Sequence, residues 1–250
     1  MSKIIIHGGF FSESSTNIET KIAKQQALLR IVKDSYAYLQ NHSALETVVY
    51  AVSQLEDDEL FNAGIGSQIQ SDGKIRMSAS LMDGESQKMS GVINIEEVKN
   101  PIQVAQVLMQ VDDRILGGSG ATNFARKHGF EPFSTEIPQR RAEYEAKLAS
   151  LRTGTVGCVA LDNNGNIAVA TSTGGKGFEI PGRISDSATV AGNYANEFCG
   201  VSLTGVGEDI VSNATAAKIV TRVTDGFSIE KAFEKTFTEL KPYDGFAGAI

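Results

Sequence analysis

The stretch "LRTGTVGCVALDNNGN", residues 151–166, joins a charged connector to an alternating run that predicts a buried strand at Val156–Leu161. The following "DNNGN" predicts a tight turn into a second strand at Ile167–Thr171. Gly154 comes directly before Thr155 at the start of the first strand. Two interpretations are open. Either Gly154 makes a turn ahead of a β-branched strand residue, or the peptide bond between the two residues breaks and leaves Thr155 as a new N-terminus.

An N-terminal threonine combines a nucleophile and a base in one residue. Its hydroxyl oxygen attacks a carbonyl carbon, and its own α-amine accepts the proton. An α-amine has a pKa of roughly 7.7–8.0, so part of it is free base at neutral pH. In an uncut chain the same nitrogen is an amide and cannot act as a base. A Gly–Thr pair alone is structural far more often than catalytic. The choice between the two interpretations therefore depends on the rest of the sequence.

Helix-like and strand-like segments are mixed along the whole chain. Apolar residues at helical spacing predict a helix over 19–39, a capping box begins another at Ser43, and Asn100-Pro101 begins a third. Further helices are expected to end near Gly129 and to cover 208–224 and 228–240. Further strands are expected at 4–7, on both sides of the Asp72-Gly73 turn, at 190–194, at 201–204 and in "GFAGAI". The mixture predicts an α/β protein.

The length fits a single domain, residues 1–250. Residues 131–153 contain two prolines, many charged side chains and no strand pattern, so this segment is the best candidate for a linker. The linker stops at Gly154, where the strand-rich second half begins.

The composition argues against several classes of protein. The formal net charge is −7 and no run of lysine or arginine stands out, so nucleic acid is not an expected partner. No segment approaches the length needed to span a bilayer, so no membrane partner is expected either. The two cysteines, Cys158 and Cys199, suit a reducing cytoplasm better than a disulfide framework.

Motifs for catalytic metals and cofactors are also missing from the sequence. The histidines, His7, His42 and His128, are far apart and lack the spacing of a zinc site. "TSTGGKGF" lacks the first glycine of a phosphate-binding loop, and "GGSGATN" departs from the dinucleotide-binding pattern. We therefore expect no catalytic cofactor, which leaves the chain to supply both nucleophile and base.

Several separate motifs resemble those of one enzyme family, in that family's order. They are "LFNAGIG" at 60–66, "MDG" at 82–84, "GTVGCVALDNNGNIAVATSTGG" at 154–175, "PGRISDS" at 181–187 and "LTGVGED" at 203–209. Over nearly the whole chain they resemble the plant-type asparaginase/isoaspartyl peptidase family of N-terminal-nucleophile hydrolases. The resemblance implies an αββα four-layer sandwich that cleaves itself into residues 1–154 and 155–250. It also implies hydrolysis of L-asparagine and β-aspartyl dipeptides through an acyl-enzyme.

The same resemblance implies which residues carry out catalysis. Thr155, freed by cleavage after Gly154, would be the nucleophile, and Thr173 would hydrogen-bond near its amine and hydroxyl. The Thr204 hydroxyl and the Gly205 N–H would form the oxyanion hole, whose donors act on charge that develops only in the transition state. The alternative for Thr204-Gly205 is a simple junction between a strand and a turn.

The resemblance also implies how the substrate is held. Arg183 would bind the α-carboxylate through its fork of N–H donors. Asp186 would pair with the α-ammonium, helped by the backbone around Gly205 and Gly207, and Asn62 would help to orient the nucleophile. Without the surrounding motifs, an ordinary surface pair would be the favoured interpretation of Arg183 and Asp186.

A structural sodium ion and a homodimer of processed protomers are further implications. The main-chain carbonyls that would hold the sodium ion are those of Leu55, Glu56, Asp58, Phe61, Ala63 and Ile65. The alternative for this loop is a solvated acidic turn. The chain stops at Ile250, where family members continue through further strands, so either this branch of the family has a shorter C-terminus or the sequence itself is shortened. Two rival functions stay open, a glycosylasparaginase and a non-catalytic relative that never cleaves itself.

Overall fold

The strand that follows Thr155 lies second in a six-stranded sheet. In the computed structural model, which describes residues 1–9, 18–146, 154–243 and 246–250, the order is β1-β5-β6-β2-β3-β4. Neighbouring strands pair antiparallel except β3 and β4, which are parallel. The strands are β1 (Lys3–His7), β2 (Met77–Asp83), β3 (Lys88–Ile95), β4 (Ile115–Gly117), β5 (Val156–Leu161) and β6 (Ile167–Thr173).

A second sheet faces the first. Its strands are β7 (Asn193–Ala195), β8 (Gly200–Gly205) and β9 (Ala247–Ala249), in the order β7-β8-β9. Strand β8 lies against β5 and β6, and β7 lies against β2 and β6. Residues at the ends of β5, β6 and β8 therefore come together although they are far apart in the sequence.

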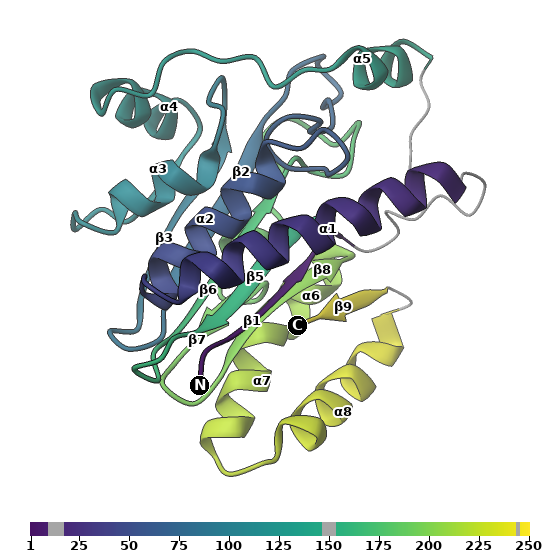
Figure 1. Ribbon diagram of the computed structural model, residues 1–250. Coiled ribbons are helices and arrows are strands. Elements are labelled where there is room, and N and C mark those ends of the chain that lie inside the picture. The colour runs from purple at the N-terminus through teal and green to yellow at the C-terminus, as the bar shows by residue number, and fades with distance from the viewer. Residues whose placement is uncertain (10–17, 147–153, 244–245) are drawn as a thin grey trace.

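Helices cover the outer sides of this pair of sheets. Helix α2 packs on β5 and β6 with α1 beside it, α3 packs on β2 and β3, and α7 packs on β7 and β8 with α8 beside it (Figure 1). The predicted α/β class is confirmed. The helices are α1 (Ile18–Leu39), α2 (Ala44–Glu56), α3 (Pro101–Leu108), α4 (Gly118–Lys127), α5 (Pro138–Glu145), α6 (Gly207–Asn213), α7 (Thr215–Thr224) and α8 (Ile229–Leu240), with 3₁₀ turns η1 (Asp186–Ala188) and η2 (Lys241–Tyr243).

The predicted hairpin between β5 and β6 is confirmed. The Asp162 carboxylate accepts hydrogen bonds from the N–H groups of Asn164 and Asn166, both at 2.9 Å. Gly165 takes up a positive φ of 91° in the same turn, a conformation that favours glycine. This turn sets the register in which Val156 pairs with Ser172.

Helix α2 begins at the predicted capping box and ends in the core. The Glu46 N–H donates to Ser43 Oγ at 3.2 Å, and Ser43 N–H donates to the Glu46 carboxylate at 2.9 Å. At the other end, the buried Glu56 carboxyl group accepts from the Ser172 hydroxyl at 2.6 Å and from Ile102 N–H at 3.1 Å. Burial raises the pKa of Glu56 to about 8. This one side chain therefore ties α2, α3 and β6 together.

The predicted strand ahead of the Asp72-Gly73 turn is wrong. Only β2 follows that turn, and β2 pairs with β3 instead. The Gln70 N–H donates to the Lys74 carbonyl at 2.8 Å and the Gly73 N–H donates to the Gln70 carbonyl at 2.9 Å, so a tight turn closes this loop. The Asp72 carboxylate also accepts hydrogen bonds from the Arg76 guanidinium. The β2–β3 turn is stabilised by the Asp83 carboxylate, which accepts from the main-chain N–H of Glu85 and Ser86.

Two other expected elements differ from the structure. Residues 208–224 form two helices, α6 and α7, because Ala214 between them is left-handed, with φ 50° and ψ 44°. Strand β7 begins only at Asn193, because the N–H groups of Gly192 and Asn193 both donate to the Thr189 carbonyl and close a turn.

The segment that the sequence assigns to a linker contains helix α5 in its described part. Arg140 on this helix is buried, and its Nε donates to the Gly66 carbonyl at 2.8 Å. The helix is therefore attached to the loop that follows α2. Residues 147–153 lie outside the described residues.

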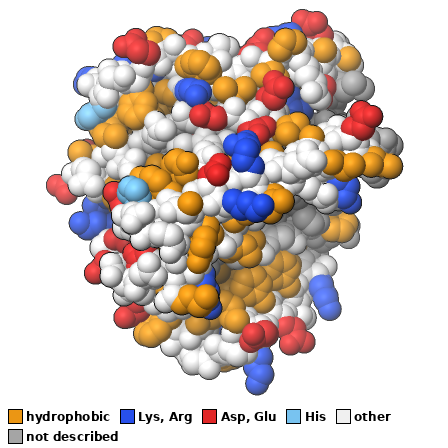
Figure 2. Space-filling view, in the orientation of Figure 1, with side chains coloured by type: hydrophobic (Ala, Val, Ile, Leu, Met, Phe, Trp, Pro, Cys, Tyr) orange, Lys and Arg blue, Asp and Glu red, His pale blue; other side chains and the backbone are white. Residues whose placement is uncertain are grey.

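One face of the molecule shows apolar side chains in a hollow over the region of β9 and α8 (Figure 2). These elements belong to a second, smaller apolar core whose outer members, including Phe233 and Phe237, are only partly buried. Phe246 and Phe227 nearby are 58% and 40% exposed. This core is less completely covered than the first.

Among the described residues, no helix is both long and apolar enough to span a membrane.

Candidate active site

Thr155 and Thr173 are brought together by the β5–β6 pair. Val156 pairs with Ser172, so Thr155, just before β5, and Thr173, at the end of β6, are the next residues outward. Both threonines are buried, at 5% exposure each. The Thr173 hydroxyl accepts a hydrogen bond from Gly175 N–H at 3.2 Å, and its expected contact with Thr155 stays a prediction.

A small cavity gathers most of the predicted site residues. Its volume is about 10 Å³, roughly the space that one water molecule needs. Because Gly154 forms part of its wall, the uncut chain itself fills space next to the Thr155 hydroxyl. The lining consists of Gly154, Thr155, Thr173, Gly175, Lys176, Arg183, Ser185, Asp186, Gly205 and Gly207.

Arg183 reaches this cavity from the loop after β6 and is paired with Glu208. The guanidinium Nε and Nη2 donate to the two carboxylate oxygens of Glu208 at 2.7 and 2.8 Å. The Arg183 hydrogen bonds lower the pKa of Glu208 to about 2. Lys176 Nζ lies 3.4 Å from the same carboxylate. The predicted carboxylate-binding arginine is thus already held by a carboxylate of the chain.

Asp186 opens the 3₁₀ turn η1 and is buried at 2% exposure. Its Oδ2 has no hydrogen-bond partner, and burial raises the pKa of the carboxyl to about 7. A Cβ on Gly207 would lie 2.7 Å from Asp186 Oδ1 and 3.2 Å from Arg183 Nη2. The glycine therefore lets both charged groups approach the start of α6, where an unpartnered carboxylate oxygen suits a cationic group.

Thr204 and Asn62 lie next to this group but are not part of the cavity lining. Thr204 is buried in β8, directly before Gly205. Asn62 Nδ2 donates to the Gly175 carbonyl at 2.5 Å, and a Cβ on Gly154 would lie 2.9 Å from Asn62 Cβ. Asn62 therefore packs against the Gly154 side of the candidate scissile bond.

Known proteins are similar to this chain over nearly its whole length. A family profile described as "Asparaginase" matches residues 1–146 and 133–250. The chain belongs to the plant-type asparaginase/isoaspartyl peptidase family. A Synechocystis protein named isoaspartyl peptidase/L-asparaginase is 46% identical over 268 residues, which cover 99% of this chain and 80% of the relative.

Other members of the asparaginase family are similar over the same length. The isoaspartyl peptidase of Escherichia coli is 36% identical, with 99% of this chain and 85% of the relative covered. The plant-type L-asparaginase of Pyrococcus furiosus is 35% identical, with 98% and 87% covered. The similarity therefore includes both the segment before Gly154 and the segment after it.

The loop expected to hold sodium in this asparaginase-family chain is rich in main-chain carbonyls. The Glu56 carbonyl accepts from Ile65 N–H at 2.7 Å and the Asp58 carbonyl accepts from Phe61 N–H at 3.1 Å, which leaves each a second lone pair. A Cβ on Gly66 would lie 2.9 Å from the Phe61 carbonyl oxygen. This donor set fits a hard cation. Among the described side chains, no cluster of three His, Cys, Asp or Glu residues could hold a metal.

Three residues near the site were missed by the sequence prediction. The Ser187 Oγ lies 3.3 Å from Thr155 Oγ1, and the Ser187 carbonyl accepts from Ser80 Oγ at 2.6 Å. Ser187 and Glu208 both fall inside the quoted motifs "PGRISDS" and "LTGVGED", so the motifs themselves were the available signal. Lys176 follows "TSTGG", and its charge was the signal in the sequence that could have indicated a place near the site.

The end of β1 also lies against the candidate scissile bond. His7 pairs with Gly157 in the sheet, and its Nε2 lies 2.9 Å from Ser202 Oγ. Burial lowers the pKa of His7 to about 4, and the nearby Thr155 main chain partly opposes this. A Cβ on Gly9 would lie 2.7 Å from Gly154 Cα. The only sequence signal was the Gly8-Gly9 pair that follows a strand.

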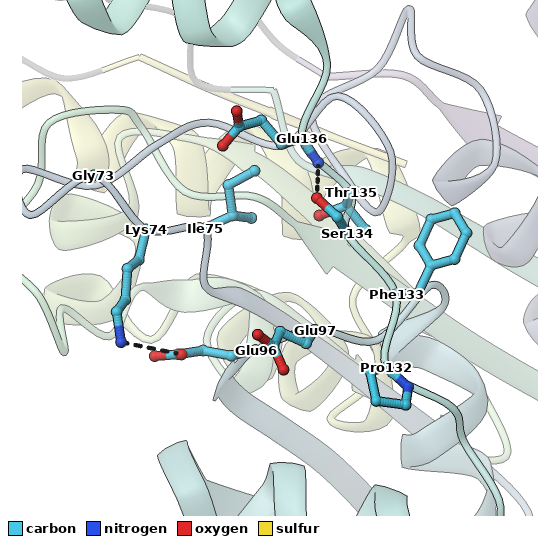
Figure 3. A pocket seen from close by; sticks show the side chains of 10 residues that line it. All are labelled: Gly73, Lys74, Ile75, Glu96, Glu97, Pro132, Phe133, Ser134, Thr135 and Glu136. Carbon is cyan, nitrogen blue, oxygen red and sulfur yellow. Dashed lines mark hydrogen bonds and ion pairs between the residues drawn. The ribbon is translucent and has the colours of Figure 1, made fainter.

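A larger pocket, of about 320 Å³, lies away from these residues (Figure 3). Its carboxylates already have cationic partners. Glu96 pairs with Lys74 at 3.6 Å, and Glu136 pairs with Arg141. The pocket therefore lacks an unpartnered buried carboxylate oxygen such as Asp186 Oδ2, and the small cavity around Thr155 stays the candidate active site.

Proposed function

We propose that this chain is an amidohydrolase that cleaves the β-amide of L-asparagine and of β-aspartyl dipeptides, with Thr155 as the nucleophile. The observation that carries the proposal is the convergence of Thr155, Thr173, Arg183 and Asp186 on one cavity from separate segments of the chain. The relatives named L-asparaginase and isoaspartyl peptidase support the same reaction.

The first step of the proposal is self-cleavage. Thr155 Oγ attacks the Gly154 carbonyl carbon, the C–N bond between the two residues breaks, and the acyl group moves to oxygen. Water then hydrolyses this ester, which leaves Gly154 as a carboxylate and Thr155 with a free α-amine. The small size of the cavity supports this order, because Gly154 occupies part of its wall and about 10 Å³ cannot hold asparagine.

Substrate hydrolysis would follow the same chemistry. The Thr155 hydroxyl attacks the β-carbonyl carbon while its α-amine takes the proton and passes it to the leaving ammonia or amine. Water then hydrolyses the acyl-enzyme and releases L-aspartate. The Thr204 hydroxyl and the Gly205 N–H would stabilise the oxyanion. Arg183 would bind the α-carboxylate, and the unpartnered oxygen of Asp186 would bind the α-ammonium.

The proposal includes the remaining features that the family resemblance implies. The two facing sheets with outer helices support an αββα four-layer sandwich. The carbonyl-rich loop after α2 would bind sodium, which would cross-link that loop. A homodimer is also proposed, for which the resemblance is the support. The buried free thiols of Cys158 and Cys199 support a cytoplasmic location.

Intact mass and a denaturing gel of the purified chain test self-cleavage. We expect two fragments that divide between residues 154 and 155. Thr155→Ala should give one full-length, inactive chain, and Thr238→Ala, on the exposed face of α8, should cleave itself normally. An active wild-type chain that stays uncut would overturn the assignment of Thr155. An uncut wild-type chain without activity would instead favour the non-catalytic alternative.

A further inference from the structure

Asn94 occupies a β-bulge at the end of β3. Ala79 pairs with Val92 and Met77 pairs with Ile95, so Ser78 on β2 faces two residues of β3. Asn94 is one of them, it is 8% exposed, and its φ of 53° is left-handed. Its N–H donates to Ser78 Oγ at 3.1 Å. Bulges turn a side chain away from its regular direction and recur beside active sites.

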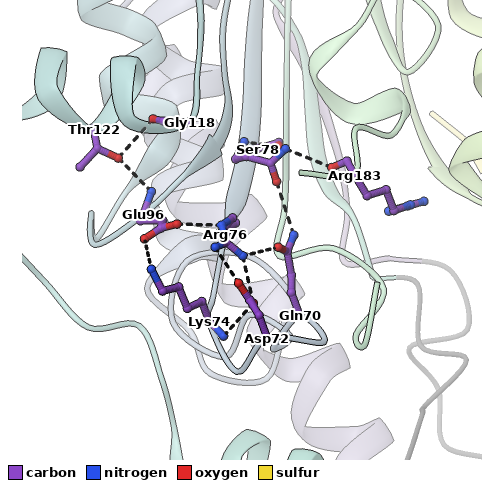
Figure 4. Close-up of polar contacts among 10 residues, drawn as sticks. Gln70, Asp72, Lys74, Arg76, Ser78, Glu96, Gly118, Thr122 and Arg183 are labelled. Carbon is purple, nitrogen blue, oxygen red and sulfur yellow. Dashed lines mark hydrogen bonds and ion pairs between the residues drawn. The ribbon is translucent and has the colours of Figure 1, made fainter. Parts of the chain in front are cut away.

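The Asn94 side chain points to the main chain of Arg183. Asn94 Nδ2 donates to the Arg183 carbonyl at 3.2 Å. Asn94 Oδ1 accepts from Gln70 Nε2 at 3.4 Å, and Gln70 Oε1 accepts from Arg76 Nη1 at 2.6 Å. Figure 4 draws this path, with Arg76 at one end and Arg183 at the other. The path connects the 70–76 loop to the residue expected to bind the substrate carboxylate.

The direction of every hydrogen bond along the path is set by its two ends. A guanidinium can only donate, so Arg76 requires the oxygen of Gln70 to face it. The Gln70 amide nitrogen then faces Asn94, which must present its own oxygen. The Asn94 amide nitrogen is left for the Arg183 carbonyl, which can only accept. No amide along the path can flip without breaking a hydrogen bond at one of its neighbours.

Two carboxylates hold the Arg76 end in place. Arg76 Nη2 lies 2.8 Å from Asp72 Oδ2, and Arg76 Nε lies 2.7 Å from Glu96 Oε1. The Arg76 side chain is only 13% exposed. A rigid donor at this end therefore orients Gln70 and, through it, Asn94.

We infer that Asn94 is a positioning residue for substrate capture, holding the Arg183 main chain so that the guanidinium faces the α-carboxylate. The inference rests on the proposed function. Glu208 holds the guanidinium of Arg183, and Asn94 holds the carbonyl, so the residue is tethered at both ends. A backbone that shifts at Arg183 moves the whole fork of donors away from the carboxylate.

Two variants of Asn94 test the role of its side-chain amide separately from the role of its left-handed backbone. Asn94→Gly keeps the left-handed conformation and removes the amide, whereas Asn94→Asp keeps the shape but puts an acceptor opposite the Arg183 carbonyl. Asn41→Gly, in the exposed turn after α1, is the matched control. The readout is ammonia release from L-asparagine and from L-asparagine α-amide, which lacks the α-carboxylate charge.

For Asn94→Gly we expect the KM for asparagine to rise about threefold to tenfold, the usual range for one lost hydrogen bond. The kcat should stay within about twofold and self-cleavage should be complete. The preference for asparagine over its α-amide should fall by the same factor as KM rises, with a larger fall for Asn94→Asp. Equal losses on both substrates, or no change on either, would overturn the inference.

A variant at the far end guards against a folding defect in the Asn94 variants. Arg76→Met removes the donor that orients Gln70, and the substrate preference should again fall; an unchanged preference would overturn the inference. If the proposed function itself is wrong, the experiment gives a different result. It would appear as wild-type protein that releases no ammonia from either substrate.

Discussion

Arg183 and Glu208 form a two-point ion pair at the edge of the candidate active site. Nε and Nη2 of the guanidinium lie 2.7 and 2.8 Å from the two carboxylate oxygens. A bidentate contact of this kind fixes the plane of the guanidinium. Nη1 is not part of this pair, so the guanidinium keeps donors for a second carboxylate while its orientation is set by the first.

Glu208→Ala should weaken substrate binding more than it slows chemistry. A freed arginine regains rotamer entropy of up to about 2 kcal/mol, so we expect the KM for asparagine to rise by about fivefold to thirtyfold. Self-cleavage should be unaffected. Asp209→Ala removes the neighbouring charge from the same turn of α6 and controls for helix electrostatics. A KM that falls in Glu208→Ala would mean that Glu208 competes with the substrate instead.

Gly207→Ala should block substrate capture for a steric reason. The added Cβ would lie 2.7 Å from both Asp186 Oδ1 and Ser185 Cβ, closer than a Cβ atom approaches either kind of atom, so the loop must shift. We expect kcat/KM to fall at least about tenfold while the chain still cleaves itself. Gly120→Ala, also in a helix, meets nothing within 4 Å and should leave kcat/KM unchanged. Steady-state kinetics on both variants would show whether the close packing matters.

Substrate affinity should depend on the protonation of Asp186. Because burial raises its pKa to about 7, the free enzyme carries a neutral carboxyl below that pH and a carboxylate above it. Only the carboxylate attracts the α-ammonium, so the KM for asparagine should rise about tenfold between pH 8 and pH 6. Titration of the Thr155 α-amine should appear in kcat instead. A KM that is flat over this range would contradict the role of Asp186.

The same raised pKa has a consequence for stability. In the unfolded chain, Asp186 has the ordinary aspartate pKa and loses its proton near pH 4. Between about pH 4 and 7, Asp186 is therefore protonated in the folded state but ionised in the unfolded state. The free energy of unfolding attributable to Asp186 therefore falls as pH rises through that window. Asp186→Asn should be more stable than wild type at pH 8 but not at pH 4, by thermal melts at both values.

Much of the candidate site follows from the sequence because its residues lie where regular strands end. The turn "DNNGN" sets the β5–β6 register, and that register brings Thr155 next to Thr173. Arg183 and Asp186 lie in a loop, but their motif is specific enough to place them on the same cavity. Glu208 was not predicted as a partner of Arg183 because nothing local in the sequence indicates which carboxylate a distant arginine will reach.

Other parts of the fold depend on contacts that local sequence does not contain. In place of the strand expected before Asp72-Gly73, a tight main-chain turn between Gln70 and Lys74 closes the loop, together with the Arg76–Asp72 pair. Strand β3 was not predicted because consecutive residues, Ser90 to Val92, are buried on both faces, so its sequence does not alternate between apolar and polar residues. Helix α5 contains few apolar residues and is fixed mainly by Arg140, so hydrophobic periodicity could not indicate it.

The break at Ala214 allows a direct test of how strongly tertiary contacts oppose helix propensity. Alanine favours a continuous helix over 208–224, yet Ala214 is left-handed, which costs an L-residue about 1–2 kcal/mol. The break is stabilised by Thr215, whose hydroxyl donates to the Ile210 carbonyl at 3.2 Å, and by Ala216 N–H, which donates to the Ala191 carbonyl at 2.8 Å.

Ala214→Gly should therefore stabilise the protein, because glycine adopts this conformation without the steric cost. We expect the free energy of unfolding to rise by about 0.5–1 kcal/mol after the entropy of the unfolded glycine is subtracted. Ala217→Gly, inside α7, should instead destabilise by about 1 kcal/mol. Urea unfolding of both variants gives the comparison. If both substitutions destabilise equally, Ala214 is helical in solution and α6 and α7 form one helix.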